Sequence, residues 1–202
     1  MVDYPAAMKT AQQAGGLPPK AQSVDRSGAP DGYIPPMAYK AQVVEGGFTR
    51  LIVSVPSARL ALVHQALISV LRPPLKFLYV RMTDRKTGQL PKPEHYVSVD
   101  LTAERVAEVL KEFTQLIHHD GRCQVWVRGA DDDQIVLEEL GALYAYPDDL
   151  GFRDALDAMG LLNVQHQSMD ERDYVRVGFL AEADAEEQKL MQDLSLTRWE
   201  RG

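Results

Sequence analysis

The sequence predicts an α+β protein whose core is a ferredoxin-like, split βαβ fold, with its helices on one face of an antiparallel sheet. Two stretches of the 202-residue chain, 51–81 and 95–129, follow the same pattern. Each contains Val-Ser-Val, then a Ser or Thr, an amphipathic run, and an aromatic residue followed by Val-Arg. Two consecutive strand–helix–strand units give the order βαββαβ of the split βαβ motif. Right-handed crossovers place both helices on the same side of such a sheet.

Residues 1–47 are predicted to form a flexible, disordered arm that precedes the core. They hold six of the twelve prolines and six of the fourteen glycines, and their apolar residues show no helical or strand period. Such a segment buries too little apolar surface to offset the entropy lost on ordering. Its candidate partner-binding residues are Tyr33, Ile34 and Met37, which would dock on a partner or back onto the folded domain. A plain linker is the alternative.

The first strand–helix–strand unit opens the core, which we assign to residues 48–129. Residues 48–55 are rich in β-branched side chains, which favour a strand. Pro56-Ser57 then supplies a turn and a helix N-cap, and apolar residues recur at helical spacing from Leu60 to Leu71. Two consecutive prolines end this helix, and a second strand follows at 75–83.

The second unit repeats this order after a polar loop. Residues 95–101 predict a third strand, and Thr102 caps the helix that follows it. Glu104 lies in the first turn of that helix, where the helix dipole favours an anion. A stripe of apolar side chains continues at helical spacing, and the fourth strand is predicted over 122–128.

Residues 130–202 are predicted to form an acidic extension of order ββαβα that packs on the core. Its first two strands form a hairpin around Leu140-Gly141. Asp148 or Asp149 caps a short helix that ends at Gly160, and a strand and a terminal helix complete the chain. The extension either continues the sheet or forms a second layer, and the sequence favours neither arrangement.

The net charge of −7 is unevenly distributed along the chain. Residues 1–47 are neutral overall, residues 48–130 carry a net charge of +5, and residues 131–202 carry −12. A chain polarised in this way can steer a partner of opposite charge to its acidic face. The alternative is two solvated faces without a role in binding.

The sequence indicates a cytoplasmic protein without membrane association. Cys123 is the only cysteine, so the chain has no intramolecular disulfide framework. The first twenty residues lack the basic leader and apolar run of a secretory signal. No stretch approaches the length of about eighteen consecutive apolar residues that a membrane span requires.

The familiar catalytic, cofactor and metal motifs are missing. The sequence has no phosphate-binding loop, nucleophile elbow or zinc-binding His-Glu-x-x-His helix, so no catalytic residue and no cofactor are assigned. The nearest group to a metal cluster is His118, His119, Asp120 and Cys123. Adjacent histidines on a helix project about 100° apart and are poor co-ligands. Asp131–Asp133 lacks the alternating acids of a calcium loop, so no metal site is predicted.

Nucleic-acid binding was weighed because split βαβ folds include RNA-binding modules. Basic residues gather around the second strand and the loop after it: Arg72, Lys76, Arg81, Arg85, Lys86 and Lys92. The third strand lacks the aromatic and glycine pattern of those modules, and the acidic C-terminal third would repel the ligand. Nucleic acid is therefore a disfavoured partner.

Two other functions stay open at this point. An enzyme could use His95, Asp100 or His166 as acid–base groups, although nothing in the sequence brings them together. A regulatory domain could sense a small molecule at the seam of a homodimer whose sheets pair edge to edge. The sequence favours a protein–protein interaction role over both.

The preferred prediction is a protein–protein interaction protein, either an adaptor or an inhibitor of the immunity-protein type. Tyr144 and Tyr146 alternate onto one face of a strand, with Leu143 and Ala145 on the other. Tyrosines beside carboxylates suit a polar-rimmed contact with a protein partner that has a basic surface. The candidate binding residues of this acidic corner are Tyr144, Tyr146, Asp148, Asp149, Asp154 and Asp157. The alternative is that the tyrosines pack within the protein and the aspartates only cap a helix.

Overall fold

The computed structural model describes residues 17–84, 90–177 and 181–199. Its strands are β1 (Ala21–Ser23), β2 (Ala38–Val43), β3 (Thr49–Ser54), β4 (Lys76–Arg81), β5 (Glu94–Val97), β6 (Cys123–Arg128), β7 (Gln134–Leu137), β8 (Leu143–Tyr146), β9 (Leu162–Asn163), β10 (Tyr174–Arg176) and β11 (Thr197–Trp199). Its helices are α2 (Ser57–Ile68), α3 (Ala103–Glu112), α4 (Thr114–His119), α5 (Leu150–Ala158) and α6 (Ala181–Asp193), with the 3-10 turn η1 (Met169–Glu171).

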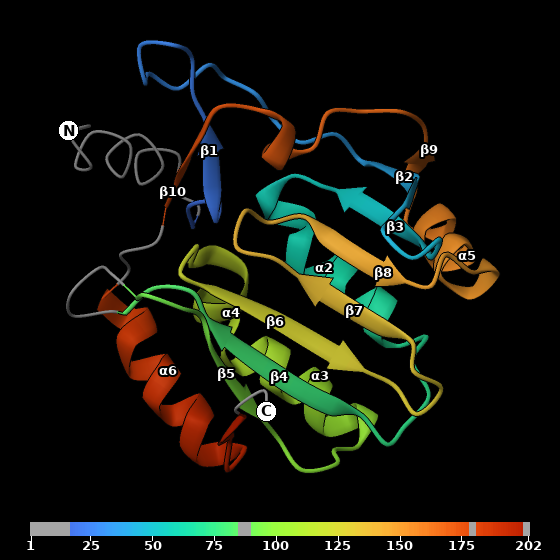
Figure 1. Ribbon diagram of the computed structural model, residues 1–202, viewed down its shortest axis with the longest axis vertical. Helices are drawn as coiled ribbons and strands as arrows, with labels where there is room; N and C mark the ends of the chain where they lie inside the picture. The colour runs from blue at the N-terminus through green and yellow to red at the C-terminus, as the bar shows by residue number, and fades with distance from the viewer. Residues whose placement is uncertain (1–16, 85–89, 178–180, 200–202) are drawn as a thin grey trace.

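Nine strands form one sheet in the order β11-β5-β4-β6-β7-β8-β3-β2-β9. Neighbouring strands are antiparallel, apart from the parallel pair β2 and β9. Strands β1 and β10 pair with each other in a separate two-stranded ribbon. Both edges of the large sheet end in short strands, three residues in β11 and two in β9. Figure 1 looks onto this sheet, with α2, α3 and α4 behind it.

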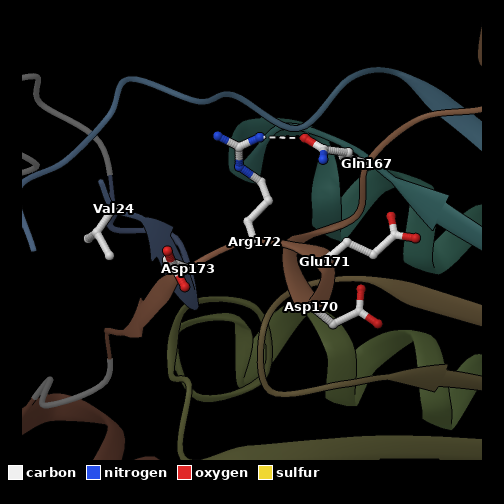
Figure 2. A pocket seen from close by; sticks show the side chains of 6 residues that line it. All are labelled: Val24, Gln167, Asp170, Glu171, Arg172 and Asp173. Carbon is white, nitrogen blue, oxygen red and sulfur yellow. Dashed lines mark hydrogen bonds between the residues drawn. The ribbon is translucent and has the colours of Figure 1, made fainter. Parts of the chain in front are cut away.

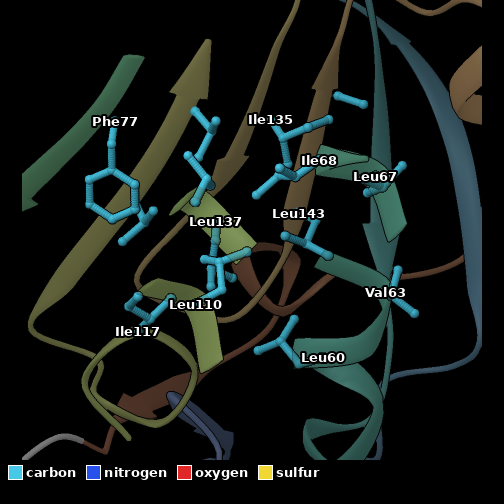
Figure 3. Close-up of a cluster of buried hydrophobic side chains, with 14 of the residues drawn as sticks. Leu60, Val63, Leu67, Ile68, Phe77, Leu110, Ile117, Ile135, Leu137 and Leu143 are labelled. Atoms are coloured by element: carbon cyan, nitrogen blue, oxygen red, sulfur yellow. The ribbon is translucent and has the colours of Figure 1, made fainter. Parts of the chain in front are cut away.

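The main core lies between the sheet and its helices. Alternate residues of the central strands, such as Phe77, Ile135 and Leu143, point into it, and Figure 3 shows Ile135 beside Ile68 of α2. All five named helices contribute to this same cluster, through Leu60, Val109, Ile117, Phe152 and Leu190. The helices therefore cover one face of the sheet, as the sequence predicts.

Most of the predicted helix caps and helix boundaries are found at or next to the residues that predict them. The Thr102 hydroxyl accepts a hydrogen bond from the Arg105 amide at 3.2 Å, which caps α3. Asp149, and not Asp148, caps α5 through the Phe152 amide at 3.1 Å. Ser57 is the first helical residue of α2 and makes no capping bond, because the N-cap position falls on Pro56. The predicted second helix is divided at Phe113 into α3 and α4.

The α+β class is confirmed, but the strand order differs from the ferredoxin-like order. In that order the first and third core strands are neighbours. Here Val53 on β3 and Val97 on β5 are separated by β8, β7, β6 and β4. A helical crossover fixes the directions of the two strands that it joins, but not the number of strands between them.

The predicted division at residue 130 is also corrected. The hairpin of β7 and β8, which we assigned to an extension packed on the core, supplies two central strands of the sheet. The buried residues of β8, Leu143 and Ala145, are part of the main core. Residues 48–129 therefore do not form a closed unit, because β3 reaches β6 only through this hairpin.

The prediction of a flexible arm over residues 1–47 is wrong for the part that the structure describes. Strand β2 pairs with β3 along six residues, and the Tyr39 ring lies in the main core with 2% exposure. Lys20 is buried, and its ammonium donates to the carbonyls of Ile117 and Cys123 at 2.9 and 3.0 Å. The apolar residues of this segment lack a period because they contact several distant elements. Residues 1–16 lie outside the described residues.

Gly121 provides a test of how the N-terminal segment docks. A Cβ atom at this position would lie 2.4 Å from the Lys20 carbonyl oxygen and 3.0 Å from that of Val177. We expect Gly121→Ala to lower the free energy of unfolding by about 1–3 kcal/mol, since backbone on both sides must shift. Urea denaturation measures the change.

Gly151 is the matched control for this prediction. It lies in α5, and the nearest atom to its added Cβ is a movable methyl of Val70 at 3.0 Å. Gly151→Ala should cause little loss, because alanine is also the better helix former. Equal stability of Gly121→Ala and the wild type would contradict the tight docking of Lys20.

Candidate functional site

The face of the sheet opposite the helices carries a continuous line of apolar and aromatic side chains. Strand register aligns its members across six neighbouring strands, and we name them the apolar row: Val97, Leu78, Trp126, Val136, Tyr144 and Ile52. Val136 and Ile52 are buried between their larger neighbours, and the other four side chains are half-buried. This face of the sheet is turned toward the viewer in Figure 1, with α2, α3 and α4 behind the sheet.

Arg50 lies beside the apolar row and is held by two tyrosines. Its guanidinium carbon lies 3.9 Å from the centre of the Tyr144 ring. Its Nε donates to Gln42 at 2.8 Å and its Nη1 donates to the Tyr146 hydroxyl at 2.5 Å. The two tyrosine rings pack edge to face with centres 6.5 Å apart. Arg50, Tyr144, Tyr146 and Gln42 therefore form one rigid group, which we name the Arg50 cluster.

Arg50 differs from Lys76, Arg128 and Lys40, the other cations of this face, because it has no carboxylate as an ion-pair partner among the described residues. Lys76 pairs with Asp100 at 2.8 Å, Arg128 pairs with Asp132 at 2.5 Å, and Lys40 pairs with Glu171 at 2.9 Å. Across the described ranges, no carboxylate lies within ion-pair distance of Arg50. Three of its five N–H groups have no protein acceptor among these residues.

The predicted tyrosine pair is thus found on one face of β8, with Leu143 and Ala145 on the other. Burial raises the pKa of Tyr144, and the charges of Glu138 and Asp170 raise it further. Tyr144 therefore keeps its proton at neutral pH and presents a neutral ring to the guanidinium of Arg50. A neutral tyrosine ring attracts a cation through its quadrupole.

The aspartates that we grouped with these tyrosines are mostly engaged inside the protein. Asp148 pairs with Arg153 at 2.6 Å, and Asp149 caps α5. Asp157 accepts a hydrogen bond from the Tyr39 hydroxyl at 2.7 Å. Asp154 is exposed on α5. Tyr144 and Tyr146 thus lie on the open face of the sheet, whereas α5, which carries Asp154 and Asp157, packs on the helix side.

The three candidate residues of the N-terminal segment also separate. The Tyr33 hydroxyl donates to the carbonyl of Gln167 at 2.5 Å, and the Arg172 guanidinium lies 4.1 Å from its ring centre. Met37 packs against the main core. Ile34 is 71% exposed. Tyr33 and Met37 thus dock the segment onto the folded chain, which is the second of the roles that the sequence left open.

An acidic pocket of about 550 Å³ lies between β1 and η1, lined by Val24, Gln167, Asp170, Glu171, Arg172 and Asp173 (Figure 2). Arg172 donates to Gln167, Ser23 and Asp31. Hydrogen bonds from Ser168 and Lys40 lower the pKa of Glu171 to about 2. These polar groups stabilise the loop after β9, and the pocket offers no unpaired donor comparable to Arg50.

The residues that resembled a metal cluster have separate partners. His118 Nε2 lies 3.1 Å from His64 Nδ1 in the core, and His119 Nδ1 donates to the Pro18 carbonyl at 2.7 Å. Asp120 binds Arg122, and Cys123 is buried against α4. Within the described residues, no group of three His, Cys, Asp or Glu side chains has the arrangement to hold a metal ion.

Of the acid–base residues named for an enzyme, His166 lies far from His95 in the fold. His95 lies on β5 with its ring against Trp199, and Asp100 pairs with Lys76. His166 Nε2 lies 2.8 Å from the hydroxyl of Ser54 on β3. Four strands separate β5 from β3, so His95 and His166 do not share a cleft.

The basic residues weighed for nucleic acid do not form a free basic surface either. Arg72 pairs with Asp131, and Arg81 pairs with Glu94 and Glu187 at 3.0 and 3.1 Å. Lys76 is paired as described above, and Lys92 is exposed near the start of β5. Arg85 and Lys86 lie outside the described residues.

Sequence reasoning missed Arg50 and the length of the apolar row. The alternation of Trp126 with Val125 and Val127 was visible, as was the alternation of the tyrosines. The signal that they share a face is the strand register, which depends on β7 and β8 lying between β6 and β3. Arg50 carries no local signal, because its stacking partners lie almost a hundred residues away.

No helix in the described parts of the chain combines the length and apolar character needed to cross a bilayer. No protein-family model, curated protein sequence or solved structure matches this chain.

Proposed function

We propose that this protein is a non-enzymatic protein-binding module that uses the open face of its sheet. The observation that carries the proposal is the apolar row, whose four half-buried members lie opposite the helical layer. Exposed apolar patches rimmed by polar groups mark interaction sites, because covering them removes apolar surface from water.

The composition of this face supports a protein partner. Trp, Tyr and Arg are the residue types that dominate binding energy at protein interfaces. Trp126, Tyr144, Tyr146 and Arg50 bring all three types onto neighbouring strands. Since Arg50 is the one cation of this face that lacks a carboxylate among the described residues, the partner surface complements it with negative charge.

Site-specific photo-crosslinking tests the proposal. A photoreactive amino acid at Leu78 in the apolar row is compared with the same group at Leu62, which is 49% exposed on α2 in the helical layer. We expect a protein adduct of defined mass from position 78 and none from position 62. The partner so identified is then purified and its affinity measured.

Two charge substitutions complete this test. Leu78→Asp should weaken the measured Kd at least tenfold, because a buried charge without a partner opposes binding, whereas Leu62→Asp should leave the Kd unchanged. Circular dichroism of both variants checks that the fold is kept. Crosslinking from position 62 alone, or equal Kd values for both variants, would contradict the proposal that the open face is the binding surface.

A further inference from the structure

We infer that the Arg50 cluster is a receptor for a carboxylate side chain, an Asp or Glu of the protein partner. This inference rests on the proposed function, and it adds the chemistry of the group that is bound. It follows from three features of the cluster: the contacts that restrain the guanidinium, the donors that it has left, and the neighbourhood of the apolar row.

The guanidinium is held in place before any partner arrives. Its carbon lies over the Tyr144 ring, and the hydrogen bonds to Gln42 and Tyr146 restrain its position there. An arginine in free solution loses rotamer freedom when it binds, so a pre-positioned side chain binds an anion at a lower entropic cost. The cluster therefore has the organisation of a binding group rather than that of a mobile surface arginine.

The unused donors suit a carboxylate. The Nε–H and one Nη1–H are taken by Gln42 and Tyr146, which leaves one N–H on Nη1 and both on Nη2. Hydrogens on Nη1 and Nη2 form the fork that binds the two oxygens of one carboxylate. Arg128 shows the contrasting case on the same face, since its Nη2 already donates to Asp132 at 2.5 Å.

The surroundings favour an acidic side chain of a protein over an isolated anion. Tyr144, on whose ring the Arg50 guanidinium rests, is itself a member of the apolar row, so a ligand that reaches Arg50 also covers apolar surface. The ligand then displaces water from around the ion pair, and the lower local dielectric strengthens that pair. Apolar contact alone does not distinguish one partner from another, whereas a charge pair does. We expect the carboxylate to set the register of the partner on the sheet.

The first experiment needs no natural partner. The full-length protein, isotopically labelled, is titrated with acetate, with neutral acetamide as control and with inorganic phosphate as a rival anion. We expect saturable NMR shifts at the Arg50 Nε–H and at the rings of Tyr144 and Tyr146 with acetate and none with acetamide. Arg50→Gln should abolish these shifts, whereas Arg128→Gln, the same charge change on the same face, should leave them intact.

The second experiment uses a random peptide library displayed on phage and selected on the full-length protein. Selected peptides whose binding is lost in Leu78→Asp should carry Asp or Glu at a fixed distance from an apolar anchor. Replacing that acid by its amide, or Arg50 by Gln, should each weaken the Kd about tenfold to a hundredfold. The two changes together should cost no more than either one, because they remove the same contact.

The two experiments separate the failure of this inference from that of the proposed function. Two results would overturn the carboxylate receptor: Leu78-dependent peptides that share no acidic position, and Leu78-dependent peptides that bind Arg50→Gln with unchanged affinity. Either result would still support the open face as a protein-binding surface. Acetate shifts in the absence of any Leu78-dependent peptide support the anion site and count against the face. Shifts with phosphate but not with acetate, or equal shifts in Arg50→Gln, also overturn the inference.

Discussion

Asp120→Ala is expected to lower the free energy of unfolding by about 3–5 kcal/mol. The Asp120 side chain has no exposed surface, and Arg122 is 6% exposed. Both carboxylate oxygens accept from the guanidinium of Arg122, at distances from 2.7 to 3.1 Å, and one also accepts from its backbone amide. Removing the carboxylate takes the buried partner away from the guanidinium of Arg122, which then keeps only the half-exposed carboxylate of Asp184 among the ion pairs described. Urea denaturation at neutral pH measures the loss.

Asp184 supplies the control for this prediction. It also binds Arg122, at 3.1 Å, but its side chain is 49% exposed. Asp184→Ala should therefore cost only about 0–1 kcal/mol, as expected for an ion pair in contact with solvent. Replacing Asp120 and Arg122 together by Leu and Met should recover much of the loss, since no unpaired charge remains. Similar small losses for Asp120→Ala and Asp184→Ala would contradict the importance of the buried charge.

Acid should unfold the protein through a buried pair of histidines. Burial lowers the pKa of His64 from its ordinary value of 6.5 to about 3, and burial also lowers that of His118. The two rings meet at 3.1 Å, and His64 Nε2 has no hydrogen-bond partner in the described structure. Above pH 6.5 both histidines are neutral in the folded and unfolded states. As the pH falls from 6.5 toward 3, only the unfolded chain takes up these protons, so unfolding becomes more favourable.

The expected loss caused by His64 is about 2 kcal/mol between pH 7 and pH 5, and His118 adds a loss in the same direction. Urea denaturation at pH 7, 6 and 5 measures it. His64→Gln and His118→Gln should each reduce the dependence of stability on pH, whatever their effect at pH 7. A double variant with the same pH dependence as the wild type would show that these histidines are not the cause.

Glu138 has the opposite effect on stability from the two histidines between pH 7 and pH 4.5. Burial raises its pKa from 4.5 to about 7, so the folded state favours the protonated carboxyl. Its contribution to stability is fully present below pH 4.5 and is lost as the pH rises through 7. In a Glu138→Gln background the acid-induced loss caused by the histidines should therefore become steeper between pH 7 and 4.5.

Local structure could be predicted from the sequence because it depends on near neighbours. The helical spacing from Leu60 to Leu67, the Thr102 cap and the hairpin at Gly141 all appear where their residues predict them. His64 follows Leu60 by four residues, so the same spacing already placed it on the buried side of α2. Such patterns indicate which side of a helix or strand is buried.

Strand order could not be predicted because alternation looks the same in a central strand and in an edge strand. Nothing in the sequence of β3 indicates that its neighbour in the sheet is β8 and not β5. Lys20 illustrates the same limit, since a lysine in a Pro-rich segment is ordinarily solvated. Its burial depends on carbonyl oxygens of Ile117 and Cys123 that only the complete fold brings together.

The central position of the β7–β8 hairpin has a consequence for the newly made chain. When residues 48–129 have left the ribosome, β3 and β6 each still lack the neighbour that joins them. The nascent polypeptide then exposes two unpaired backbone ladders, a state prone to misassembly and to capture by chaperones. Because β2, β3 and β5 also pair with strands from residues 130–202, we expect slow folding that is completed only after β8, β9 and β11 have been synthesised.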